Sequence, residues 1–68
     1  LLARALPALT PREAEVLHWL TEGKRDAEIA RVLGVRPHTA STHVKNLLAK
    51  LHVETRLAAA AVGLRARG

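Results

Sequence analysis

Cysteine and methionine are both absent from this sequence, and Trp19 is its only aromatic residue. Without cysteine, neither a disulfide nor a thiolate-bound metal can supplement the core. Long alternating runs of β-branched residues are missing as well, which predicts an all-α domain. Sixty-eight residues make one domain, near the lower size limit for stability from core burial alone. Helix packing is therefore expected to supply the stability, alone or with help from a partner.

Long apolar runs are missing too. None approaches the roughly 20 residues of a membrane span, and no secretory signal precedes the domain. Both absences favour a cytoplasmic protein without a membrane partner. Because the chain starts at Leu1 and has no methionine, we expect it to be part of a longer protein. Residues 1–8 show no regular spacing of apolar residues and are interpreted as a linker remnant. Residues 9–68 are then the domain.

Positive charge is in excess. Eleven Lys and Arg stand against six Asp and Glu, a net charge of +5. This balance favours a polyanionic partner, with nucleic acid first and acidic membranes or proteins second. From charge alone, a basic surface that serves only solubility remains the alternative.

The first helix is predicted by its ends. Thr10 and Glu13 have the spacing of a capping box, and Pro11 suits the first helical position. The helix should run to about Glu22, because Gly23 supplies the positive φ that often follows a helix end.

The next two helices are separated by a short turn. Asp26 can start one of them, since its carboxylate can accept backbone N–H groups and suits the helix dipole. Gly34 ends that helix, and Pro37 starts another that runs to about Leu51. Two helices with so short a connection predict a helix-turn-helix, whose second helix enters the DNA major groove.

The helix from Pro37 has two distinct faces. Its apolar residues form a stripe about 100° wide that should face the core: Ala40, Val44, Leu47, Leu48 and Leu51. The opposite face is polar and is predicted to bind DNA. Almost directly across from the stripe lie Thr42 and Ala49, with His38, Lys45 and Asn46 beside them.

Recognition helices usually present their N-terminal half to base edges. This places Ser41, Thr42 and Lys45 as candidates for base contacts. Four further residues are better placed for phosphates: Thr39, His43, Asn46 and Lys50. Basic charge gathers nearby at Lys24, Arg25, Arg36, Lys45 and Lys50.

A fourth helix is predicted from Arg56 to about Arg65, with Thr55 as its N-cap. It is apolar all round, because Leu57 and Leu64 project on one side and Val62 on nearly the opposite side. The core can cover one of these sides, and a second subunit can cover the other. The predicted dimer surface consists of Leu57, Ala61 and Leu64. The alternative is an alanine-rich terminal helix that frays.

Catalytic and metal sites are not predicted. His38 and His43 lie about 140° apart on one helix and cannot share a metal ion. No Gly-rich phosphate loop is present, and no arrangement pairs a nucleophile with a base. We therefore expect neither an enzyme nor a cofactor.

Three segments together resemble the LuxR-type DNA-binding domain, the GerE-like output domain of NarL/FixJ response regulators and quorum-sensing regulators. These are LTPREAEVLHWLTEG at 9–23, EIARVLGV at 28–35 and TASTHVKNLLAKLHVETR at 39–56. The resemblance covers residues 9 to about 64. It implies four helices, the third in the major groove and the fourth dimerising on a two-fold DNA site, under the control of an upstream regulatory domain.

The resemblance also implies roles for individual residues. Thr42 and Lys45 would be the principal base contacts, while Thr39, His43, Asn46 and Lys50 would position the DNA backbone. Three positions depart from the family pattern. Ser41 stands where a lysine is common, Arg36 where serine often caps the helix, and Arg25 where a small capping residue is frequent. These departures concern DNA sequence preference rather than the fold.

Two other functions fit the pattern less well. A sigma-factor-like promoter-reading module has a similar helix-turn-helix and would bind RNA polymerase, but it works as a single copy. A protein-interaction domain that has lost DNA binding would explain the missing lysine at Ser41.

Overall fold

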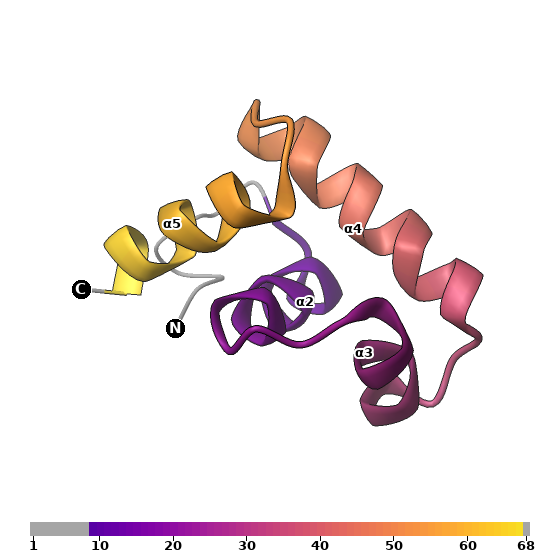
Figure 1. Cartoon of the computed structure of the whole chain (residues 1–68). Coiled ribbons are helices and arrows are strands. Elements are labelled where there is room, and N and C mark those ends of the chain that lie inside the picture. The colour runs from indigo at the N-terminus through magenta and orange to yellow at the C-terminus, as the bar shows by residue number, and fades with distance from the viewer. Residues whose placement is uncertain (1–8, 68) are drawn as a thin grey trace.

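The structure is a computed structural model that describes residues 9–67 (Figure 1). This part of the chain forms four helices. They are α2 (Pro11–Thr21), α3 (Asp26–Leu33), α4 (Pro37–Leu51) and α5 (Arg56–Arg67). No strand occurs in this range, so the predicted all-α class is confirmed. The predicted linker remnant, residues 1–8, lies outside the described residues.

Side-chain caps start the first and last of these helices. Thr10 Oγ1 accepts the Glu13 N–H at 3.1 Å, and Glu13 Oε1 accepts the Thr10 N–H at 2.8 Å, so the predicted capping box is present. Thr55 Oγ1 accepts the Ala58 N–H at 3.0 Å at the start of α5. These bonds satisfy backbone N–H groups that have no partner within the helix.

Left-handed residues end three of the helices. Gly23 has φ 76° and Gly34 has φ 70°, as predicted. His52 ends α4 with φ 57°, although a side chain makes this region unfavourable. The sequence carried no glycine there to signal the turn.

The capping of α3 differs from the prediction. Its N-cap is Arg25, whose N–H is accepted by Glu28 Oε1 at 2.9 Å. Asp26 is the first helical residue, and its carboxylate accepts hydrogen bonds from distant side chains instead. The prediction that the helix starts at Asp26 is confirmed, but the carboxylate that accepts a backbone N–H there belongs to Glu28 and not to Asp26. The last helix also extends to Arg67, beyond the predicted Arg65.

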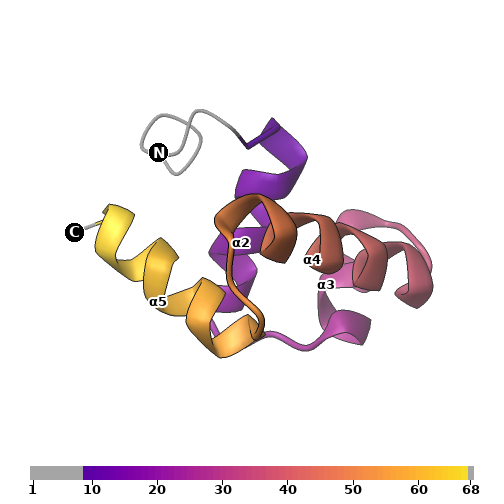
Figure 2. The same cartoon turned by 90° about the horizontal axis from the view of Figure 1, so that it is seen from above.

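Helix α4 contacts each of the other three helices. Helix α2 also contacts α5. Figures 1 and 2 show α3 beside the N-terminal part of α4 at one end of the molecule, while the other end of α4 leads to α5. All four helices contribute to the core, whose buried apolar residues are Leu9, Ala14, Val16, Leu17, Leu20, Ile29, Ala30, Ala40, Val44, Leu47 and Ala59.

A glycine allows α5 to approach α2 closely. A Cβ built on Gly63 would lie 2.7 Å from Thr21 Cγ2 and 3.1 Å from Leu17 Cδ1. Neither neighbour can move easily, because Leu17 is fully buried and the Thr21 hydroxyl donates to the His18 carbonyl at 2.5 Å. The absence of a side chain at this position is therefore a packing requirement.

We predict that Gly63→Ala lowers the free energy of unfolding by about 1–3 kcal/mol, the usual cost of overfilling a packed site. Chemical denaturation followed by circular dichroism measures this. Ala61→Gly, in the same helix, is the control for helix propensity and should cost about 1 kcal/mol. If Gly63→Ala instead stabilises the protein by a similar amount, propensity outweighs the contact with α2.

Candidate nucleic-acid interface

Burial orients α4. Ala40 and Leu47 are fully buried and Val44 is 6 % exposed, and these three residues form one stripe of the helix. Leu48 and Leu51 are half-buried against the same core. Side chains on the other side must then point outward. They are exposed as predicted: His38, Thr42, Lys45, Asn46, Ala49 and Lys50.

The hydroxyl groups at the start of this face bond within the protein. Thr42 Oγ1 donates to the His38 carbonyl at 3.0 Å. Ser41 is half-buried, and its Oγ donates to Asp26 Oδ2 at 2.6 Å. Thr39 and His43 lie half-buried along the edge of the face. The structure thus places the predicted contact residues of α4 on its outer face and along its edges.

Two predicted basic residues lie near the N-terminal ends of α3 and α4. Arg36 is the exposed N-cap of α4 and makes no side-chain cap. Lys24 lies half-buried in the connection before α3. Their positive charge suits a phosphate backbone.

Asp26 is the centre of a polar junction between three helices. Besides Ser41 of α4, its carboxylate binds Arg56 at the start of α5, with Nη1 and Oδ1 2.7 Å apart. The hydrogen bond from Ser41, together with the Arg56 guanidinium, holds the pKa of Asp26 below its usual range. Asp26 therefore stays ionised and fixes α3, α4 and α5 relative to one another.

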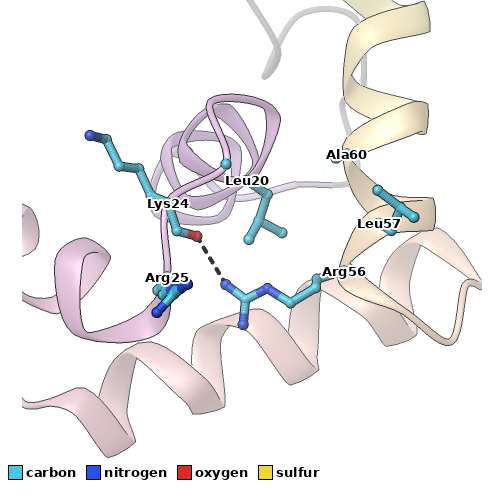
Figure 3. Close-up of a pocket in the computed structure, with 7 residues that line it drawn as sticks. Leu20, Lys24, Arg25, Arg56, Leu57 and Ala60 are labelled. Carbon is cyan, nitrogen blue, oxygen red and sulfur yellow. Dashed lines mark hydrogen bonds between the residues drawn. The ribbon is translucent and has the colours of Figure 1, made fainter.

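Arg56 also closes the side of a shallow pocket between the α2–α3 connection and α5 (Figure 3). Its Nη2 donates to the Lys24 carbonyl at 3.1 Å. The Lys24 side chain extends away from this bond, so its ammonium group is not used in it. The connection that carries Lys24 and Arg25 is thus attached to the start of α5.

A second polar contact joins α4 to α2. Lys50 Nζ lies 2.7 Å from Glu13 Oε1, and the Glu13 side chain is largely buried while that of Lys50 is 40 % exposed. The hydrogen bond from Lys50, with further ones from Thr10, lowers the pKa of Glu13. Lys50 was predicted as a phosphate contact, and here its ammonium group binds a carboxylate beside the exposed face.

Sequence reasoning missed all three of these side-chain contacts. Ser41 and Asp26 are 15 residues apart, Arg56 and Asp26 are 30 apart, and Lys50 and Glu13 are 37 apart. One signal was present, because Glu13 falls at helical spacing on the same stripe as Val16, Leu17 and Leu20. A charge on a buried stripe requires a partner.

The predicted dimer residues lie on the outer side of α5. Leu57 is 80 % exposed and Leu64 is 51 % exposed, while Ala61 is half-buried between them. The inward side consists of the buried Ala59 and Gly63. This helix therefore has an apolar side that its own domain does not cover.

Residues 9–67 contain neither a candidate metal site nor a membrane-spanning helix. Within that range no three His, Asp or Glu residues come together as metal ligands. None of its helices is both long enough and apolar enough to cross a membrane.

A short first helix, a tight turn and a second helix with a polar outer face define a helix-turn-helix domain, an arrangement typical of DNA-binding proteins. Comparison with known families agrees: the family described as "Bacterial regulatory proteins, luxR family" matches residues 7–62. The chain belongs to this family, which confirms the predicted resemblance and disfavours the sigma-factor-like alternative. The family is one of regulatory proteins and not a class of enzymes.

Several curated proteins are similar to the chain. It is 45 % identical over 60 residues to the nitrate/nitrite response regulator protein NarP of Escherichia coli (strain K12), covering 88 % of this chain and 28 % of NarP. The transcriptional activator protein AnoR of Acinetobacter nosocomialis is 46 % identical over 52 residues, 76 % of this chain and 22 % of AnoR.

The quorum sensing-dependent transcriptional regulator VjbR of Brucella abortus (strain 2308) is 41 % identical over 56 residues, 82 % of this chain and 22 % of VjbR. The chain thus spans about a quarter of the length of these relatives. No solved structure was found to match it.

We predict that Glu13→Gln lowers the free energy of unfolding by about 1 kcal/mol at pH 7, because a bond to a charged partner is lost beside the core. The lowered pKa of Glu13 means that its contribution is complete above the pKa of the unfolded chain. That contribution is lost as the pH falls through the folded pKa, so the difference between the two proteins should shrink below about pH 4. Urea denaturation at several pH values measures it.

The matched control is Glu15→Gln. Glu15 forms only an exposed pair with Arg12 at 3.6 Å, which should contribute little. Equal effects of the two substitutions at pH 7 would show that the buried pair with Lys50 has no special role.

Proposed function

We propose that this chain is the sequence-specific DNA-binding output domain of a bacterial transcription regulator, with α4 in the major groove of double-stranded DNA. The observation that carries the proposal is the outer face of α4, which is polar, basic and exposed directly opposite the buried stripe. An α-helix fits this groove, and donors and acceptors on such a face can read base edges.

The proposed contacts fall into two groups. Thr42 and Lys45, with Ser41 beside them, face the bases from the first half of α4. The phosphate backbone is bound by the residues on the edges of α4 and near its N-terminus: Lys24, Arg36, His38, Thr39, His43, Asn46 and Lys50. Lys50 can take part because its side chain remains 40 % exposed next to Glu13. A phosphate would then compete with that carboxylate for the ammonium group.

We propose that two copies bind a two-fold DNA site through α5. Leu57, Ala61 and Leu64 would meet the same residues of the second copy, as an isologous interface requires. The patch is small, and interfaces well below about 1,000 Å² are usually weak. The free domain should therefore be largely monomeric at micromolar concentration and pair when two half-sites hold it.

The rest of the regulator is proposed from its relatives. Because the chain spans about a quarter of their length, an upstream regulatory domain in a cytoplasmic protein is proposed, of the response-regulator kind named for NarP or the quorum-sensing kind named for VjbR. RNA polymerase is a further proposed partner. A protein-interaction domain without DNA binding is the competing function, and it predicts no affinity for any duplex.

Binding to DNA should depend steeply on salt. If about four to six phosphates are neutralised per subunit, a plot of the logarithm of the binding constant against the logarithm of salt concentration should have a slope of roughly −4 to −5.

We predict that Lys45→Ala weakens binding to a preferred site by about 1–3 kcal/mol and binding to random DNA by much less, because it removes a base contact. Fluorescence anisotropy with labelled duplexes measures both quantities.

Arg36→Ala is the matched control, because it removes one positive charge that is assigned to phosphate. It should weaken binding to all duplexes alike and make the salt slope less steep by about 0.9. If Lys45→Ala behaves in the same way, Lys45 contacts phosphate and not a base. Binding that is unchanged between low and physiological salt would exclude the electrostatic part of the proposal.

We predict that Ala61→Glu abolishes cooperative occupation of a two-half-site operator, since like charges would face each other across the two-fold axis. Binding to a single half-site should stay nearly unchanged. Val32→Glu adds the same charge at an exposed apolar residue of α3 and should leave cooperativity intact. Gel-shift titrations on one and two half-sites compare the variants. Cooperativity that survives Ala61→Glu would place the dimer on another surface.

A further inference from the structure

Two of the residues proposed to face the bases, Ser41 and Thr42, carry hydroxyl groups. Each hydroxyl donates its proton to another group of the protein. Thr42 Oγ1 donates to the His38 carbonyl at 3.0 Å, and Ser41 Oγ donates to Asp26 Oδ2 at 2.6 Å. A hydroxyl group has only one proton to donate. Neither residue therefore offers a donor to a base while these bonds are kept.

Thr42 still has two groups to present. It is exposed on the outer face, where its γ-methyl and the remaining lone pairs of its oxygen are available. Guanine shows only acceptors in the major groove, at N7 and O6, and adenine N7 and thymine O4 are acceptors too, whereas the donors at adenine N6 and cytosine N4 could bond to the lone pairs of the Thr42 oxygen. None of these acceptors can bond to a group without a proton. The C5-methyl of thymine, in contrast, takes an apolar contact.

We propose that Thr42 selects thymine through contact between its γ-methyl and the C5-methyl of the base. The proposal rests on the proposed placement of α4 in the major groove and adds the chemistry that Thr42 reads. Lys45 supplies the donor that Thr42 lacks and pairs with guanine.

The spacing of the two residues limits where the thymine lies. Thr42 and Lys45 are separated by about 4.5 Å along the helix axis, against about 3.4 Å for one step of the DNA. The thymine should therefore fall within one or two base pairs of the guanine that Lys45 contacts. Ala49, exposed about two turns beyond Thr42, presents a second methyl group on the same side.

The experiment removes single methyl groups from each partner. Preferred duplexes are first selected from random sequence with the 68-residue chain, and each thymine is then replaced by deoxyuridine, which lacks only the C5-methyl. At one position the affinity should fall about three- to fivefold, the size expected for one methyl group returned to water. Thr42→Ser should lose the same factor on the thymine duplex and no longer distinguish thymine from uracil.

Thr42→Val keeps a methyl group and loses the hydroxyl, so it should keep the preference for thymine over uracil. Thr55→Ser is the control, because it also removes one methyl while serine preserves the cap of α5. It should bind both duplexes as the unchanged chain does. Circular dichroism confirms equal helicity of the variants.

The outcomes separate the two levels of the proposal. If Thr42→Ser retains the preference for thymine, or Thr42→Val loses it, the hydroxyl group reads the base and the methyl contact is wrong. A preferred site in which no deoxyuridine substitution matters also overturns the methyl contact, while leaving DNA binding intact. If the unchanged chain binds no duplex, the proposed function itself fails.

Discussion

The burial of one stripe of α4 is the constraint on which the rest of the domain depends. Ala40, Val44 and Leu47 enter a core that α2 and α3 also line. Because neighbouring side chains on an α-helix are separated by a fixed angle, burying these three residues settles the direction of every other one. A rotation by one residue would turn a large polar side chain such as Lys45 toward the core and expose apolar groups. The polar outer face of α4 is thus a consequence of core packing.

Two polar contacts fix the position of α4 along its own axis. Near the start of α4, Ser41 binds Asp26, and near its end, Lys50 binds Glu13. Apolar contacts are not directional, so on their own they would allow α4 to slide along its axis. Hydrogen bonds near both ends resist such movement because they require a defined geometry. The same carboxylate of Asp26 holds Arg56, so the start of α5 is fixed to the helix-turn-helix as well.

Local features of this fold could be predicted from sequence, and contacts between distant side chains could not. The capping box of Thr10, the turns at Gly23 and Gly34 and the two faces of α4 depend on residues a few positions apart, where helix geometry determines what meets. The partners of Asp26 and Glu13 depend on how whole helices pack. The spacing of residues within one helix does not determine that packing. His52 shows a third case: it ends α4 in the left-handed conformation, and no glycine marks that position in the sequence. The identity of the residues on the outer face of α4 was predictable, but the use of the Thr42 and Ser41 protons was not.

The size of the residues in α5 explains why this helix is apolar on two sides. Its inward side is formed by Ala59 and Gly63, and the distance of 2.7 Å from a Cβ at Gly63 to Thr21 leaves no room there for a larger side chain. Close approach to α2 thus excludes leucine from the inner side, and Leu57 and Leu64 lie outside. Small inward residues bury little area, so α5 adds modest stability to its own domain. A second copy that covers the outer leucines would supply part of what the inner side lacks, and in the proposed dimer DNA binding would therefore also stabilise this end of the fold.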